Sequence, residues 1–151
     1  MKRLLLLLMI CLPFVSFAQQ HIGKTKAIVK KSLQLEAKKV PGAVLSDSGT
    51  VLSYSLKQGT SSTVNFIYRF NKAGICISEQ VTGQCDSCFK NQLNKVLADT
   101  KYGWKKINEN QYASKFSEKM VIELPGNTED NSYMILRTDW DEAMYKLLTG
   151  E

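Results

Sequence analysis

Residues 63–74 have the sequence Thr-Val-Asn-Phe-Ile-Tyr-Arg-Phe-Asn-Lys-Ala-Gly, and this stretch decides the fold. One set of alternate side chains is large and apolar: Val64, Phe66, Tyr68 and Phe70. A period of two is typical of a strand that buries one face, so these four side chains are expected in the core. Residues 71–74 follow as a hairpin connection in which Gly74 can take a positive φ. The stretch therefore predicts an antiparallel pair of strands.

Further strands are predicted on both sides of this segment. Before it, residues 52–56 alternate apolar side chains with serines. After it, residues 75–82 continue the alternation, and the side chains expected on the core side are Ile75, Ile77 and Val81. Together these segments predict a three-stranded antiparallel meander.

Two amphipathic helices are predicted, over residues 25–38 and 86–100, because apolar side chains there recur every three or four positions. The residue before Pro41 is pushed out of helical geometry, which ends the first helix. Asp86 or Ser87 is available as the N-cap of the second helix.

The second half of the chain repeats the order of a helix followed by strands. Strands are expected over residues 104–108, 111–116, 120–124 and 132–138. A short helix over residues 141–148 ends the chain, with Asp141 as its cap and Trp140 and Tyr145 at the spacing of a hydrophobic staple. The sequence thus predicts the α+β class: an antiparallel β-meander sheet covered by amphipathic helices, in two helix-plus-meander halves.

One part of the chain resembles a known group of proteins. The segment from Lys24 to Thr82 combines a basic helix, Leu-Ser-Tyr-Ser-Leu at 52–56 and a Tyr-x-Phe-Asn-x-x-Gly hairpin at 68–74. It resembles the helix-plus-meander modules of small exported bacterial proteins, including beta-lactamase-inhibitor-protein-like domains and a small lipoprotein of the outer-membrane assembly machinery. The second half lacks the hairpin motif. The resemblance implies a binding or assembly role without catalytic machinery, and it transfers no site residues.

The first eighteen residues have the three-part layout of a secretory signal peptide. Lys2 and Arg3 give a positive start, residues 4–17 are almost entirely apolar, and small residues stand at Ser16 and Ala18. Cleavage after Ala18 leaves residues 19–151 as a single exported domain that is periplasmic or secreted. Loss of the two cations lowers the formal net charge from +6 to +4.

Two other interpretations of this leader are less favoured. A transmembrane anchor needs roughly 20 apolar residues, whereas this segment is shorter and contains Pro13. A lipoprotein signal would need a small residue before Cys11, where Ile10 stands. We therefore expect no transmembrane segment in the mature chain.

Lysines concentrate in the first predicted helix and its flanks. Residues 24–39 contain one acidic residue, Glu36, and a candidate basic binding face of Lys24, Lys26, Lys30, Lys31, Lys38 and Lys39. Such a face could meet an anionic envelope component or an acidic protein, or it could be a solvated helix surface. Nucleic acid is not expected as a partner, because export separates the protein from it and no recognised motif is present.

Three cysteines remain after cleavage: Cys76, Cys85 and Cys88. If Cys76 opens a strand of seven residues, about 20 Å separate it from the far end, and a disulfide needs Cα atoms within about 7 Å. Cys85–Cys88 is therefore the expected disulfide, and Cys76 is expected as a free thiol on the polar face of its strand. A strand that breaks near Ser78 would undo this argument.

The Cys85-x-x-Cys88 spacing at a helix start is compatible with four interpretations: a structural bridge, incidental thiols, a redox-active pair or a metal site. The structural bridge is favoured. Zinc would need four ligands, and the one histidine, His21, falls within residues 19–23, which are expected to form a loose lead-in to the domain. No catalytic residue, metal or cofactor is predicted. The leading hypothesis is a non-enzymatic exported or envelope-associated binding module of unknown partner that uses its sheet face or basic helix. The alternative is a thiol–disulfide redox protein centred on Cys85 and Cys88.

Overall fold

The computed structural model describes residues 21–58, 62–125 and 131–151. The predicted signal peptide, residues 1–18, therefore lies outside the described residues. Within them the chain forms helices α1 (Lys26–Ala37), α2 (Asp86–Leu97) and α3 (Glu142–Thr149), together with a short 3-10 turn at Phe116–Glu118. The described strands are β1 (Val44–Ser48), β2 (Val51–Gln58), β3 (Ser62–Phe70), β4 (Cys76–Gly83), β5 (Lys105–Asn108), β6 (Gln111–Ala113), β7 (Met120–Glu123) and β8 (Ser132–Arg137).

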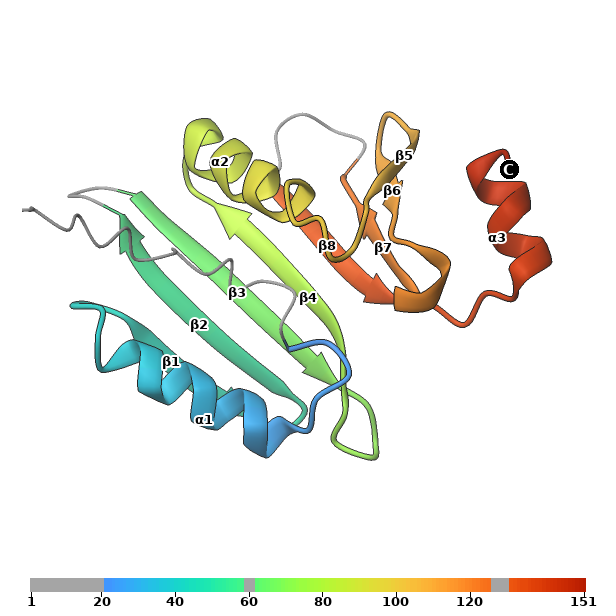
Figure 1. Cartoon of the computed structure of the whole chain (residues 1–151). Helices are drawn as coiled ribbons and strands as arrows, with labels where there is room; N and C mark the ends of the chain where they lie inside the picture. Colours follow the sequence, from blue (N-terminus) through green and yellow to red (C-terminus); the bar gives the residue numbers. More distant parts are fainter. Residues whose placement is uncertain (1–20, 59–61, 126–130) are drawn as a thin grey trace, which may run out of the picture.

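All these strands belong to one antiparallel sheet in the order β1-β2-β3-β4-β8-β7-β6-β5. Each half of the chain contributes a helix followed by four strands, and the halves join through their last strands, β4 and β8 (Figure 1). The predicted α+β class and the two helix-plus-meander halves are confirmed. The joining register pairs Gln80 with Met134 and Val81 with Tyr133.

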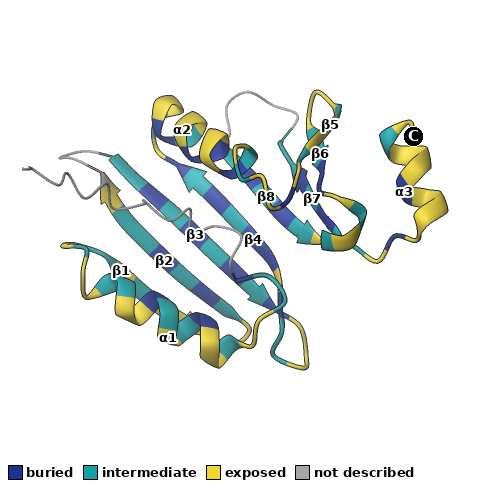
Figure 2. Cartoon of the chain, in the orientation of Figure 1, coloured by how far each residue is buried: buried dark blue, intermediate teal, exposed yellow. Residues whose placement is uncertain are grey.

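Helices α1 and α2 cover one face of the sheet, which we call the helix face (Figure 1). Val29 and Leu33 of α1, and Leu93 and Val96 of α2, are buried in the same core as the inward side chains of the strands. Buried bands alternate with more exposed ones along the central strands (Figure 2). All four aromatic and apolar side chains that define the predicted pattern of residues 63–70 are buried, as expected.

Helix α3 packs on the opposite face, beside β5, β6 and β7. Trp140 and Tyr145 form a second, smaller core with Ala113, and their rings lie 5.4 Å apart. Asp141 caps the helix by accepting a hydrogen bond from the Met144 backbone N–H at 2.8 Å. The predicted cap and hydrophobic staple are therefore both present.

The first meander has four strands, one more than predicted. Strand β1 was missed because its sequence, Val-Leu-Ser-Asp-Ser, is mostly polar and its side chains are mostly exposed at the sheet edge. A hairpin at Gly49 and Thr50 connects it to β2, and Gly49 takes the positive φ (60°) that favours glycine.

The prediction that Ile77 faces the core is wrong, because the start of β4 is irregular. The β3–β4 register shifts so that Arg69 pairs with Ser78 and Phe70 pairs with Cys76, which leaves Ile77 as an extra residue. Ile77 is 40% exposed, whereas Cys76 is fully buried. This bulge lies near Ser78, but the strand continues to Gly83 and still separates Cys76 from Cys85.

Two positions on α1 test the packing of the helix face. Leu33 is fully buried and Leu35 is 52% exposed. We expect Leu33→Ala to lower the free energy of unfolding by about 2–5 kcal/mol, because it leaves a cavity in the core. The matched control Leu35→Ala should change it by about 0.5 kcal/mol or less. Urea denaturation followed by circular dichroism measures both, and equal effects would contradict the assigned helix orientation.

Candidate functional site

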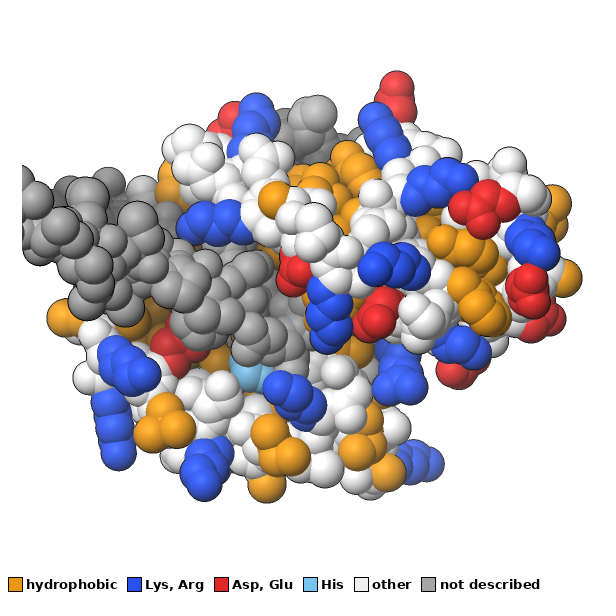
Figure 3. All heavy atoms as spheres, in the orientation of Figure 1, with side chains coloured by type: hydrophobic (Ala, Val, Ile, Leu, Met, Phe, Trp, Pro, Cys, Tyr) orange, Lys and Arg blue, Asp and Glu red, His pale blue; other side chains and the backbone are white. Residues whose placement is uncertain are grey.

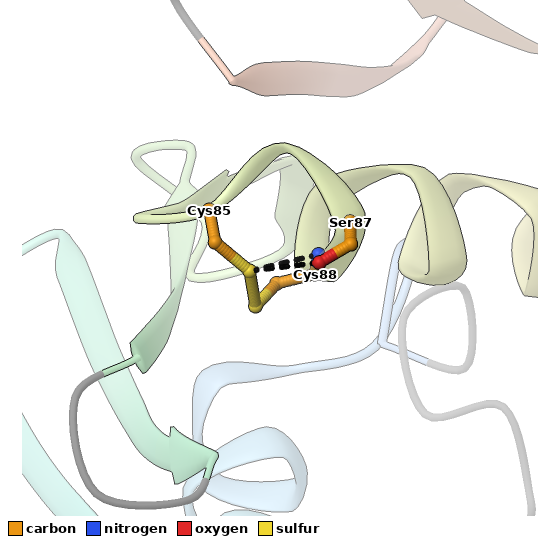
Figure 4. The surroundings of a disulfide bond; sticks show 3 residues. All are labelled: Cys85, Ser87 and Cys88. Atoms are coloured by element: carbon orange, nitrogen blue, oxygen red, sulfur yellow. Dashed lines mark hydrogen bonds between the residues drawn. A yellow bond between two sulfur atoms is a disulfide. The ribbon is translucent and has the colours of Figure 1, made fainter.

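The Cys85–Cys88 disulfide lies at the start of α2 (Figure 4). The two Cα atoms are 5.2 Å apart and the sulfur atoms are at bonding distance, which agrees with the expected local pair. The predicted N-caps Asp86 and Ser87 are wrong. Cys85 is the N-cap, and its Sγ accepts the Cys88 backbone N–H at 3.0 Å.

This arrangement allows thiol chemistry as well as simple crosslinking. Cys85 is half-buried, Cys88 is 9% exposed, and the Ser87 hydroxyl lies 3.3 Å from Cys85 Sγ. A sulfur at a helix N-terminus is stabilised as a thiolate by the unsatisfied backbone N–H groups. Cys85 is the more exposed of the two cysteines and lies at the N-cap itself.

Cys76 is a free cysteine, as predicted, but its predicted position on the polar face is wrong. It lies in the core, and its Sγ is 3.6 Å from the Ser78 carbonyl oxygen. Burial, followed by the nearby Glu79 carboxyl, raises the pKa of the Cys76 thiol to about 12. Cys76 is thus a poor nucleophile in the folded protein.

The six lysines of the candidate basic face divide into two sets. Lys26 and Lys30 point to β1, where both pair with the Asp47 carboxylate, and the Lys30 Nζ–Asp47 Oδ2 distance is 2.8 Å. These contacts lower the pKa of Asp47. The exposed remainder consists of Lys24, Lys31, Lys38 and Lys39. Cationic side chains are spread over this side of the molecule (Figure 3).

The face of the sheet opposite α1 and α2 is covered by α3 only at its β5–β7 end. Over β2, β3, β4 and β8, no helix of the described chain packs on it. We call this surface the open sheet face. One row across it comprises Ser53, Ile67, Gln80 and Met134, and the next comprises Val51, Arg69, Ser78 and Leu136.

The open sheet face mixes apolar and hydrogen-bonding side chains. Most of its members are half-buried rather than buried. The Arg69 guanidinium donates to Gln80 Oε1 at 3.2 Å, and the Ser55 hydroxyl donates to Asn65 Oδ1 at 2.7 Å. These cross-strand bonds fix the orientation of the polar groups, so the surface is ordered before any partner arrives.

The helix face holds a buried polar cluster that the sequence did not predict. Glu79 is fully buried beside Tyr68 on β3 and Ile135 on β8, and neither carboxyl oxygen has a hydrogen-bond partner among the described residues. His21, expected in a loose lead-in, is 1% exposed, and its ring lies 5.2 Å from the Tyr68 ring. The Tyr133 hydroxyl is also buried and has no partner within the described part of the chain.

Backbone hydrogen bonds hold His21 over the core. The Gly23 N–H donates to the Cys76 carbonyl, and the Cys76 N–H donates to the Lys24 carbonyl, both at 2.8 Å. Thr25 and Ile75 form an isolated antiparallel bridge in the same segment. The lead-in is thus an extension of the sheet. The types of its side chains do not predict this role, because backbone groups make the contacts.

Burial shifts the protonation of this cluster. It raises the pKa of Glu79 well above 4.5, so the carboxyl is favoured in its neutral form. Burial, assisted by Lys24, lowers the pKa of His21 from 6.5 to about 4. The pKa of Tyr68 and that of Tyr133 are raised by burial first and by Glu79 second.

Among the described residues, no group of three or more His, Cys, Asp or Glu side chains is placed to hold a metal ion. No helix in the described ranges is long and apolar enough to cross a membrane. No protein-family model, curated protein or solved structure matches the chain. The site must therefore be interpreted from its own residues.

Opposite pH effects are expected from Glu79 and His21. Glu79 has a raised pKa in the folded state, so its contribution is most favourable below pH 4.5 and is lost as the pH rises toward the folded value. His21 has a lowered pKa, so its contribution is fully present above pH 6.5 and is lost as the pH falls toward about 4.

Single substitutions separate these two effects. Relative to the wild type, Glu79→Gln should make stability rise more steeply with pH between 4 and 6.5, because of the two groups in the cluster only His21 then titrates differently between the folded and unfolded states. His21→Phe should leave a stability that falls with pH above 4.5. Denaturant unfolding at a series of pH values measures the slopes, which approach about 1.4 kcal/mol per pH unit for one group. Parallel profiles for the wild type and both variants would contradict the assignment.

Proposed function

We propose that this chain is a non-enzymatic, exported binding domain that engages a protein partner through its open sheet face. The proposed export rests on the predicted signal peptide of residues 1–18. The resemblance of the Lys24 to Thr82 segment to small exported binding and assembly modules supports the same role.

The observation that carries the proposal is the uneven covering of the sheet. The helix face is covered by α1 and α2, whereas no helix of the described residues packs on the other face of β2, β3, β4 and β8. Ile67, Met134 and Leu136 are only partly covered there. An exposed surface that mixes aliphatic side chains with pre-aligned polar groups is typical of protein interfaces.

The chemistry of this surface favours a folded protein with a protruding segment. Arg69 supplies a guanidinium near the end of β3, where it donates to Gln80, and Asn65 supplies an amide further back along the same strand. Apolar side chains of the partner would be covered by Ile67 and Met134, which occupy one row of the sheet. A rigid antiparallel sheet loses little conformational entropy when such contacts form.

Position-specific photo-crosslinking tests the proposal in the native envelope and in culture medium. A photoreactive side chain at Ser53, Gln80 or Met134 should give the same discrete adduct, because all three positions lie in one row. The matched control is Ile28, which is 53% exposed on the outer side of α1. It should give no such adduct.

A substitution provides the second readout. Met134→Arg on the open sheet face should reduce the adduct formed from Ser53 by about tenfold or more, as loss of a central interface contact does. Ile28→Arg on α1 should leave it unchanged. Adducts that form equally from Ile28, or that survive Met134→Arg undiminished while Ile28→Arg removes them, would place the interface on the helix face and overturn the proposal.

Thiol–disulfide exchange is a second candidate function, favoured by the position of Cys85 at the N-terminus of α2. A purely structural four-residue loop would stabilise the fold by about 2 kcal/mol. We expect the Cys85→Ser, Cys88→Ser double variant to lose about that much stability and to keep the crosslink from Ser53. Equilibration with glutathione measures the reduction potential, and a potential in the exchangeable range together with loss of function in the double variant would favour the redox role.

A further inference from the structure

A cleft on the helix face lies where the start of the chain meets the second half of the sheet. Its volume is about 350 Å³. It is lined by Ile22, Lys24, Lys101, Tyr102, Ser117, Glu118, Met120 and Arg137. These residues come from the lead-in, the connection after α2, the 3-10 turn, and the paired strands β7 and β8. The cleft exists only because the fold brings these segments together.

Positive charge predominates in this cleft. It has three cationic side chains, those of Lys24, Lys101 and Arg137, and one carboxylate, that of Glu118. Within the described residues, none of the three cations lies within 4.0 Å of a carboxylate oxygen. This differs from Lys26 and Lys30, which both pair with the Asp47 carboxylate. The three cations are therefore available to an anion from outside the chain.

Contacts with neighbouring residues position two of the cations, Lys101 and Arg137. The Lys101 Nζ is 3.2 Å from the Tyr102 hydroxyl oxygen and 4.7 Å from the centre of the Tyr102 ring. The Arg137 guanidinium passes close to Gly23, where an added Cβ would lie 3.0 Å from Nη1. Gly23 has a φ of 83°, so both its backbone conformation and this close approach favour glycine.

The other residues that line the cleft indicate the chemistry of the rest of the ligand, beyond its anionic group. The Ser117 side chain brings a hydroxyl group to the cleft, and Ile22 and Met120 supply apolar surface. The Tyr102 ring stacks on Trp104 with ring centres 5.8 Å apart, which makes this wall rigid. Three cations and one carboxylate leave two net positive charges, the complement of a dianionic phosphate.

We infer that this cleft binds a phosphate group carried by a small organic molecule or a lipid headgroup. The cations hold the phosphate oxygens, and Ile22 and Met120 contact the adjoining carbon atoms. Met120 pairs with Arg137 across β7 and β8, on the side of the sheet that α1 and α2 cover. The cleft is thus on the opposite side from the open sheet face, and its ligand is independent of the proposed protein partner.

Titration of the purified protein with inorganic phosphate and with glycerol phosphate tests the inference. Amide chemical shifts of Lys101, Ser117 and Arg137 should move saturably, while equal ionic strength from sodium chloride should not reproduce the shifts. Arg137→Gln and Lys101→Gln should each weaken binding by about threefold to tenfold, because each removes a charge-assisted hydrogen bond. Lys57→Gln, an exposed lysine of β2, is the matched control and should have no effect.

Glu118→Gln should change the affinity for phosphate in the opposite direction. Removal of the one carboxylate in the cleft should tighten phosphate binding by about threefold or more. Vesicles of phosphatidylglycerol, compared with phosphatidylcholine, distinguish a lipid headgroup from a soluble phosphate as the source. Absence of saturable binding to all these probes, equal weakening by Lys57→Gln, or weaker binding in Glu118→Gln would overturn the inference.

Discussion

The pairing of β4 with β8 is the interaction on which the structure depends. Each half of the chain ends in one of these strands, and their antiparallel register converts two four-stranded meanders into one sheet. The same pairing places both helices on one side, because the inward side chains of the two halves then share a face. Without it, each half would expose the edge of its last strand, whose unpaired N–H and C=O groups are a template for pairing with another chain.

The central position of β4 also explains the unusual chemistry of the helix face. Strand β4 has a neighbouring strand on both sides, and the side chains that it directs to the helix face are buried in the core. The Glu79 carboxyl group is therefore fully buried and has no hydrogen-bond partner in the described ranges, and burial favours its neutral form. Burial of a carboxyl group without a compensating hydrogen bond costs free energy, so apolar packing alone does not explain a glutamate at this position.

Sequence reasoning predicted the parts of the fold that depend on local pattern. The period-two alternation of residues 63–70 and the spacing of Cys85 and Cys88 are local, and the structure agrees with both. Strand β1 was missed because an exposed edge strand has no buried face to produce the alternation. The bulge at Ile77 depends on the β3 partner and inverts the expected faces of Cys76 and Ile77.

The candidate sites were harder to predict because tertiary contacts assemble them. His21 is positioned by backbone hydrogen bonds around Gly23 and Cys76, which any sequence compatible with the turn could make. By sequence Lys24 is part of the candidate basic face, yet the structure places it in a cleft with Lys101 and Arg137. Strand β8 contributes to both surfaces: Leu136 lies on the open sheet face, and the next residue, Arg137, lines the cleft on the helix face. Because neighbouring residues of a strand point to opposite faces, β8 contributes one residue to the proposed partner surface and the next residue to the proposed phosphate cleft.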